Sequence, residues 1–140
     1  MRKPKKKSYS ALKKEADRVF SIWVRKRAAN EFGIATCVTC LNAFEWPRLH
    51  AGHFIPRHYL ATRWDERNVN CQCPQCNIFK KGAYVEYAAF LISFYGPGII
   101  EELLREKRKT VKFSRSDLEA LIEKYSVQDL PEAKISLKRS

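Results

Sequence analysis

Two C-x-x-C pairs constrain the fold of this chain more than any other feature of its sequence. Cys37 and Cys40 form the first pair, and Cys73 and Cys76 form the second. Each pair can present two sulfurs to one tetrahedral zinc ion at about 2.3 Å. A thioredoxin-like redox pair would need a flanking strand and helix that the sequence does not show. We therefore predict one structural Zn²⁺ bound by all four thiolates, with a long insertion between the pairs, and no assigned role for Cys71.

The charge of the chain indicates a polyanionic partner. It has 27 Lys+Arg against 15 Asp+Glu, a formal net charge of +12 in 140 residues. The excess extends along the whole sequence, which favours nucleic acid as the partner over a surface that is merely basic. No run reaches the roughly 20 apolar residues of a membrane span, and the lysine-rich start lacks the apolar stretch of a signal peptide. We expect a cytoplasmic protein, in which cysteines bind metal rather than form disulfides.

The chain is long enough for one domain with short tails. We expect residues 1–9 to form a flexible basic arm, residues 10–130 a single domain, and residues 131–140 a basic tail. From Ser10, the predicted N-cap, apolar residues recur at helical spacing until Gly33 supplies a stop. The first structural element is therefore predicted to be a long amphipathic helix.

The middle of the chain has no helical period. We expect short strands around residues 44–46 and 51–55 and a third near Val69. Pro74 suits the first turn of a helix, because its missing N–H would be unpaired there. Cys76 and Asn77 would then project from the opening turns of that helix.

The last third of the chain reads as three helices. A strongly apolar helix follows Gly82, a second begins after Gly98, and Ser116 and Glu119 are expected to form a capping box for the third. The apolar stripe of the last helix has helical spacing and comprises Leu118, Leu121, Ile122 and Tyr125. The predicted fold class is α+β and predominantly helical.

The insertion and the second cysteine pair carry the motifs HAGHFIPRH (residues 50–58) and NVNCQCPQCN (residues 68–77). These motifs resemble the HNH, or His-Me finger, endonucleases, and most closely the NinG (Rap) recombination endonucleases of lambdoid phages. The resemblance implies a ββα-metal core, cleavage of DNA at branched recombination intermediates, and a host bacterial cytoplasm as the location. Matched by position, it assigns the catalytic histidine to His53, the central asparagine to Asn68, and the final metal ligand to Asn77.

The chemistry of these residue types suits hydrolysis of a phosphodiester. A histidine with a pKa near 6.5 can accept a proton at neutral pH, so His53 is the predicted general base. The amide oxygen of Asn77 is a neutral hard ligand that suits Mg²⁺ or Mn²⁺. Asn68 is expected to orient His53 by a hydrogen bond.

One position departs from the family pattern. Many HNH enzymes place a metal-binding acidic residue or histidine directly before the catalytic histidine, and this chain has Gly52 there. His50 is the best substitute ligand for the catalytic ion, and Asp65 is a weaker one. If neither reaches the ion, Asn77 and the DNA alone would hold it.

Basic residues lie around the proposed site in the sequence, where a basic rim could hold phosphates on either side of the cut. The expected DNA-binding residues are Arg57, Arg63, Arg67, Lys80 and Lys81. His58 is expected at the surface or on a phosphate.

The resulting hypothesis is a metal-dependent endonuclease acting on branched DNA such as Holliday junctions or D-loops. Symmetric cutting of a junction would suggest a homodimer. The alternative is a zinc-stabilised DNA-binding module without catalysis, which Gly52 keeps open. A third hypothesis is a structural recombination partner acting through its C-terminal helices, with residues Leu118 to Tyr125 as an interface.

Overall fold

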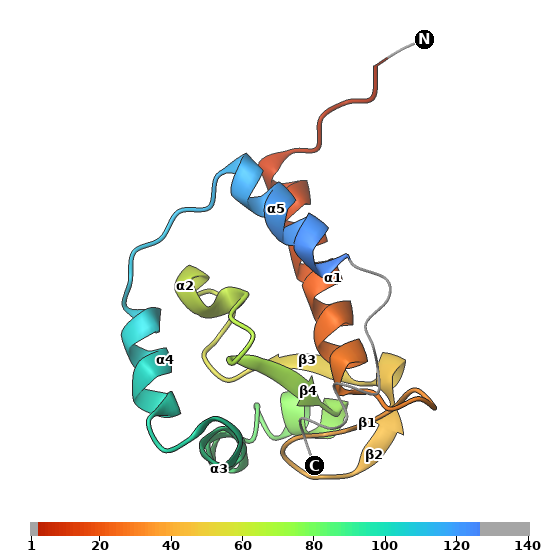
Figure 1. The fold of residues 1–140 in the computed structure, drawn as a ribbon, viewed down its shortest axis with the longest axis vertical. Coiled ribbons are helices and arrows are strands. Elements are labelled where there is room, and N and C mark those ends of the chain that lie inside the picture. The colour runs from red at the N-terminus through yellow and green to blue at the C-terminus, as the bar shows by residue number, and fades with distance from the viewer. Residues whose placement is uncertain (1–2, 127–140) are drawn as a thin grey trace.

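A computed structural model describes residues 3–126 of the chain. The longest element is α1 (Tyr9–Ala28), and α5 (Arg115–Tyr125) lies alongside it although the two are far apart in the sequence (Figure 1). Between them the chain forms short strands and helices in the following order: β1 (Ile34–Thr36), β2 (Ala43–Glu45), η1 (Trp46–Arg48), β3 (His50–His53), α2 (Leu60–Arg63), β4 (Val69–Gln72), η2 (Gln75–Phe79), α3 (Tyr84–Tyr95) and α4 (Ile99–Lys107).

The sequence predicted α1 correctly except at its two ends. Ser8 rather than Ser10 is the N-cap, because its hydroxyl accepts a hydrogen bond from the backbone N–H of Ala11. The helix ends at Ala28, and Gly33 with a positive φ of 75° serves the turn that leads into β1. The apolar stripe of α1 is buried against the rest of the chain, and it comprises Leu12, Ala16, Val19, Phe20 and Val24.

The strands form two antiparallel hairpins. In the first, β1 pairs with β2, and the loop between them carries the first cysteine pair; the sequence reading missed β1. In the second, β3 pairs with β4 in a register that sets His53 opposite Val69 and His50 opposite Gln72. All four residues of β4 are buried, including the polar side chains of Asn70 and Gln72. The second hairpin therefore lies at the centre of the molecule, against α1.

The helix predicted to begin near Pro74, with Cys76 and Asn77 in its opening turns, is shorter than expected. Residues Gln75–Phe79 make a single π-helical turn, η2. The chain then reverses through Lys81 and Ala83, which have positive φ values of 50° and 46°, before α3 begins at Tyr84. The turn η2 is therefore separate from α3, and η2 alone positions Asn77.

The structure of α5 differs from the prediction in its capping box, and it shows where the apolar face of this helix lies. The capping box of α5 is formed by Ser114 and Asp117 rather than by Ser116 and Glu119. Leu118 and Tyr125 are buried in one cluster with the apolar stripe of α1. Because that face of α5 is core, it does not supply the free interface of the third hypothesis.

The described residues form a mostly helical α+β structure with two small hairpins, in agreement with the predicted class. Residues 3–8 of the expected arm are exposed and project from the body (Figure 1), whereas its last residue, Tyr9, begins α1. The expected tail, residues 131–140, lies outside the described residues. Among the described helices, none has the length and apolar character needed to cross a membrane.

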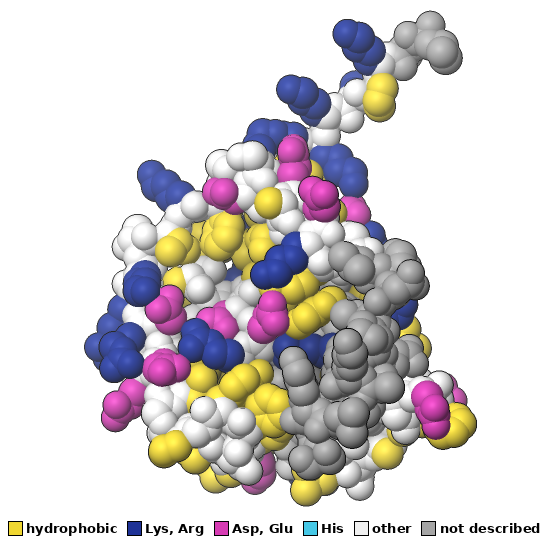
Figure 2. Space-filling model, viewed as in Figure 1, with side chains coloured by type: hydrophobic (Ala, Val, Ile, Leu, Met, Phe, Trp, Pro, Cys, Tyr) yellow, Lys and Arg dark blue, Asp and Glu magenta, His cyan; other side chains and the backbone are white. Residues whose placement is uncertain are grey.

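On the face drawn in Figure 2, charge is distributed rather than gathered in one block. Figure 2 shows Lys and Arg side chains along the amino-terminal segment and, on the rest of this face, interspersed with Asp and Glu. Several of the arginines form ion pairs with these acids, as described below. These ion pairs therefore offset part of the positive charge of the chain.

Candidate functional site

The four predicted zinc ligands come together in space. The sulfurs of Cys37, Cys40, Cys73 and Cys76 all lie within 4.8 Å of one another, and those of Cys40 and Cys73 are 3.8 Å apart. Tetrahedral ligands at the usual Zn–S distance of about 2.3 Å would be about 3.8 Å apart. The β1–β2 loop supplies one pair, and the segment from the end of β4 into η2 supplies the other. The donor set and its spacing fit a structural zinc ion.

The protonation of these thiols shows why a cation belongs among them. Burial opposes ionisation of Cys37, but hydrogen bonds from the Thr39 hydroxyl and from backbone N–H groups lower its pKa to about 6. Burial and the neighbouring sulfurs raise the pKa of Cys76 to about 12. Without a cation, the cluster therefore favours one thiolate beside protonated thiols. A bound zinc ion would allow all four to ionise.

The fifth cysteine lies apart from this cluster. The thiol of Cys71 points at the backbone of α1, with its sulfur 3.7 Å from the carbonyl oxygen of Val24 and 4.0 Å from that of Arg25. It is fully buried. Cys71, to which the sequence assigned no role, therefore makes a packing contact between β4 and α1.

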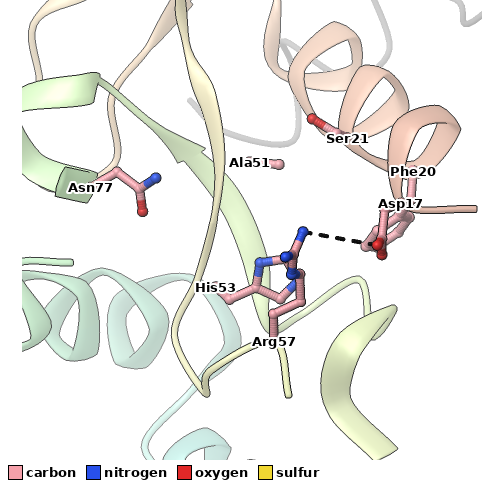
Figure 3. A pocket seen from close by; sticks show the side chains of 7 residues that line it. All are labelled: Asp17, Phe20, Ser21, Ala51, His53, Arg57 and Asn77. Atoms are coloured by element: carbon pink, nitrogen blue, oxygen red, sulfur yellow. Dashed lines mark ion pairs between the residues drawn. The ribbon is translucent and has the colours of Figure 1, made fainter. Parts of the chain in front are cut away.

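A pocket of about 310 Å³ lies beside the central hairpin. Its lining residues come from α1, β3, the loop after β3, and η2, and they are Asp17, Phe20, Ser21, Ala51, His53, Arg57 and Asn77. Figure 3 shows the α1 residues on one side of the pocket and Asn77 on the other, with His53 and Arg57 between them. The pocket thus brings together His53, the predicted general base, and Asn77, the predicted metal ligand, although 23 residues lie between them in the sequence.

His53 is held by one specific backbone contact. Its Nε2 lies 2.9 Å from the carbonyl oxygen of Arg63 at the end of α2. A carbonyl oxygen can only accept, so Nε2 carries the hydrogen and Nδ1 is the nitrogen with a free lone pair in the neutral ring. Burial lowers the pKa of His53 below its usual value near 6.5, partly opposed by the carbonyl of Arg63 and by Asp17. At neutral pH the ring is therefore uncharged and able to take a proton at Nδ1.

His50 and Asn77 form a second contact beside the pocket. The Nδ1 of His50 lies 3.0 Å from the amide nitrogen of Asn77. When the amide group donates to Nδ1, its oxygen is left as an acceptor. Two adjacent ligands of an octahedral ion at about 2.1 Å would also be about 3.0 Å apart. The pair therefore fits two ligand positions of a Mg²⁺-like ion once the amide is turned to present its oxygen.

Asn68 does not reach His53 as expected. Its amide group donates to the carbonyl oxygens of Ile55 (3.0 Å) and Thr62 (3.1 Å), and its oxygen accepts from the N–H of Ile55 at 2.7 Å. The side chain is completely buried, and these three bonds tie both ends of the 54–63 loop to the start of β4. Asn68 thus fixes the segment that carries the Arg63 carbonyl. Its effect on His53 is indirect, through that carbonyl.

The structure explains the glycine at position 52. Ala51 and His53 line the pocket, and side chains alternate along a strand, so His50 and Gly52 lie on the opposite face of β3, where His50 contacts Asn77. A Cβ at Gly52 would overlap the side chain of Gln72. The carbonyl of Gly52 also accepts a 2.6 Å hydrogen bond from the buried hydroxyl of Tyr87. Gly52 is therefore a packing requirement of the hairpin.

Two of the predicted DNA-binding arginines are held by acidic residues. Arg63 forms a two-point ion pair with Asp17, and its side chain is only 11% exposed. Arg67 pairs with Asp65 and with Glu102. These contacts occupy both guanidinium groups, and the pair with Arg67 also occupies Asp65, the weaker candidate for the metal ligand.

The other predicted contacts remain on the surface. The side chain of Arg57 is 63% exposed and lines the pocket, with a long ion pair of 3.9 Å to Asp17. Lys80 and Lys81 are exposed after η2. The ring of His58 is exposed and lies 4.1 Å from the ring of Tyr59. These positions are available to phosphates.

The sequence reading missed Asp17. Besides Arg63 and Arg57, its carboxylate accepts a 3.1 Å hydrogen bond from the indole N–H of Trp64. It therefore links α1 to the residue whose carbonyl holds His53. The available signal was an acidic residue bordering the buried stripe of a helix whose other polar positions are largely basic.

Comparisons with known proteins place this chain among phage proteins. Residues 1–134 match the family described as "Bacteriophage Lambda NinG protein". The ninG protein of Salmonella phage P22 is 28% identical over 99 residues, covering 69% of this chain and 45% of that protein. The ninG protein of Escherichia phage lambda is 32% identical over 93 residues, covering 64% of this chain and 42% of that protein. The chain thus spans less than half the length of these relatives, and no solved structure matches it significantly.

Proposed function

This chain belongs to the bacteriophage lambda NinG protein family, and we propose that it is a metal-dependent endonuclease that hydrolyses phosphodiester bonds in DNA. The observation that carries the proposal is the state of His53. Its ring is fixed by the Arg63 carbonyl, uncharged at neutral pH, and placed in one pocket with Asn77. This is the arrangement that a general base needs.

We further propose that the centre of the molecule is a ββα-metal core. The antiparallel pair β3–β4 supplies His50 and His53 from one strand. The turn η2, which is attached to the cysteine cluster through Cys76, supplies Asn77. The element after the hairpin is a single π-helical turn rather than the longer helix expected from the resemblance.

The role of His53 follows from its tautomer. A water molecule in line with the scissile P–O bond would give a proton to Nδ1 as its oxygen bonds to phosphorus, and the bond to the departing sugar oxygen would break. The Nε2–H bond to Arg63 stabilises the imidazolium that forms, because the carbonyl dipole faces the new charge. The ring can then return the proton to solvent or to the departing oxygen.

Asn77 and His50 are the residues that would hold a catalytic Mg²⁺ or Mn²⁺. When bound, such an ion would neutralise charge on the phosphate and on the departing oxygen. Both ligands are neutral, so the chain would hold the ion weakly until the phosphate adds its own oxygens. Asp17 adds no charge to this ligand set, because its oxygens are engaged by Arg63, Arg57 and Trp64.

The proposed substrate is branched DNA of recombination, such as a Holliday junction or a D-loop, in the host cytoplasm. The support is the net charge of +12 and the exposed cations, namely Arg57, which lines the pocket, and Lys80 and Lys81, which follow the pocket residue Asn77 in the sequence. Cations of this kind bind the DNA backbone whatever its sequence. Selection would then rest on the shape of the DNA.

A second candidate is a zinc-stabilised DNA-binding module without catalysis. It is favoured by one observation, namely that the only carboxylate lining the pocket, among the residues that the structure describes, is paired with arginines. The two candidates make different predictions for the wild-type chain. Incubation with a synthetic four-way junction in Mg²⁺ or Mn²⁺ should give cleavage that stops without added divalent ion while zinc stays bound. Binding without cleavage under any divalent ion would favour the module.

A further inference from the structure

The residues that follow Asn77 form an exposed apolar and basic tip. We define the tip as Ile78, Phe79, Lys80 and Lys81. Ile78 is 57% exposed and Phe79 is 74% exposed, and both lysines are exposed. Burying a phenylalanine typically contributes about 2 kcal/mol or more, so an exposed one beside a pocket needs an explanation.

The backbone of the tip is fixed by the cysteine cluster. The N–H of Asn77 donates to the carbonyl of Cys73, and the N–H of Gly82 donates to the carbonyl of Cys76, each at 2.9 Å. Within the tip, the N–H of Lys80 donates to Gln75 at 2.9 Å and the N–H of Lys81 donates to Ile78 at 3.1 Å. A segment tied in this way cannot fold its apolar side chains inward without breaking the turn. The exposure is therefore built into the fold.

The composition of the tip indicates its partner. Lysine is depleted in protein–protein interfaces, whereas apolar and aromatic side chains next to cations are how proteins bind unstacked nucleic-acid bases. The bases of a continuous duplex are stacked and present no free face. At a branch point the stack is interrupted, and a side chain such as phenylalanine or isoleucine can occupy the gap.

We propose that the tip is a branch-recognition element, in which Phe79 and Ile78 pack against unstacked bases at a DNA branch point while Lys80 and Lys81 hold the adjoining phosphates. The proposal rests on the DNA-directed function proposed above. Because Asn77 lines the pocket and Ile78 follows it directly, the base contact would set which phosphate lies at His53. Branch selection would then belong to the residues that directly follow the proposed metal ligand Asn77, and proton transfer to His53 on β3.

The test measures binding by the full chain without added divalent ion, so that no cleavage is needed. Affinities for a four-way junction and for a linear duplex of the same sequence and arm length are compared. Phe79→Ala should weaken junction binding roughly 5- to 150-fold, the range for loss of one aromatic–base stack, and leave duplex binding unchanged. Phe79→Tyr should retain the preference for the junction.

Phe32→Ala is the matched control. Phe32 is 78% exposed, but it lies in the turn between α1 and β1 and is flanked by Glu31 and Gly33. The Phe32→Ala variant should leave the affinities for junction and duplex unchanged. Equal effects of Phe79→Ala on junction and duplex, or no effect on either, would overturn the proposal. Loss of self-association in place of junction preference would also overturn it, by showing that the tip is a protein interface. Absence of cleavage by a wild-type chain that prefers junctions would count against the nuclease alone.

Discussion

The Nε2 of His53 lies 2.9 Å from the carbonyl oxygen of Arg63, whose guanidinium is paired with Asp17 on α1. The orientation of the proposed base is therefore set by a residue 36 positions earlier in the numbering, through one ion pair and one backbone carbonyl. This chain of contacts couples the position of the long helix to the pocket.

The first prediction concerns Asp17→Asn. Losing the charge breaks the two-point pair with a largely buried guanidinium, which should cost about 2–4 kcal/mol of unfolding free energy. A displaced Arg63 carbonyl should lower cleavage of junction DNA about 10- to 100-fold while DNA binding is retained. Denaturant unfolding and single-turnover cleavage measure the two effects. Glu15→Gln is the control, since Glu15 pairs with exposed Lys7 and Arg18 on the same helix and should change neither.

The second prediction concerns pH. Burial lowers the pKa of His53, so the ring is protonated only below its usual range and the base is available at neutral pH. Cleavage should rise with pH through an apparent pKa below 6.5 and then level off. Stability should also rise with pH over this range, because the folded state binds a proton at His53 less readily than the unfolded state. Stability should therefore fall as pH falls through about 6.5.

His53→Gln provides the check on this pH dependence. It should remove the contribution of this residue to the loss of stability in acid, whereas His58→Gln, at an exposed position, should not. A rate that falls as pH rises from 6 to 7 would argue against a neutral His53 acting as the base.

The third prediction concerns the cysteine cluster. Cys76→Ser should abolish the bound zinc and unfold the chain, since such sites contribute on the order of 10 kcal/mol, as much as the net stability of a domain. Cys71→Ala should keep the zinc, because its sulfur contacts the backbone of α1 and lies outside the cluster. Elemental analysis and circular dichroism of the two variants measure this contrast. Retained zinc and fold in Cys76→Ser would contradict the four-thiolate site.

The fourth prediction concerns Gly52. Gly52→Ala should destabilise the chain by roughly 1–3 kcal/mol, because the added carbon overlaps the Gln72 side chain. In a double-mutant cycle with Gln72→Ala, the combined loss should be at least about 1 kcal/mol smaller than the sum of the single losses. Additive losses would mean that the two side-chain positions do not compete for space.

The fifth prediction concerns salt. DNA binding should weaken steeply between about 50 and 200 mM salt, because cations on the protein displace counterions from DNA. Arg57→Ala should reduce the slope of log affinity against log salt by about 1, since Arg57 is exposed at the pocket. Arg67→Ala should leave the slope unchanged and lower stability instead, because Arg67 is held by Asp65 and Glu102. A flat response in the wild-type chain would contradict a phosphate-binding surface.

The sequence was most informative where spacing along the chain determines geometry. The spacing of two C-x-x-C pairs predicted one shared ion, and the four sulfurs converge as expected. The helical stripes of α1 and α5 were readable because a period of 3.6 residues reports directly which face is buried. Cap positions were missed because several serines compete near each helix start, and only the backbone geometry selects Ser8 and Ser114.

The sequence was least informative about polar partners. The side-chain amide of Asn68 makes three hydrogen bonds, and no neighbouring residue in the sequence indicates that Ile55 and Thr62 are the partners. Arg63 looked like part of a basic rim because its acidic partner Asp17 comes from α1, far away in the sequence. Arg67 also has a distant partner, Glu102 in α4, besides the neighbouring Asp65. The contact between Gln72 and Gly52 depends on the register of the hairpin, which the sequence pattern left open.

The most direct test of the account is single-turnover cleavage of a synthetic four-way junction by the wild-type chain and by His53→Ala, at pH 7.5 with Mg²⁺ or Mn²⁺. Loss of a general base typically costs about 100- to 10,000-fold in rate. We predict a loss in that range for His53→Ala, with zinc content, fold and junction affinity unchanged, and no loss for His58→Ala. Cleavage by His53→Ala at the wild-type rate would contradict the account.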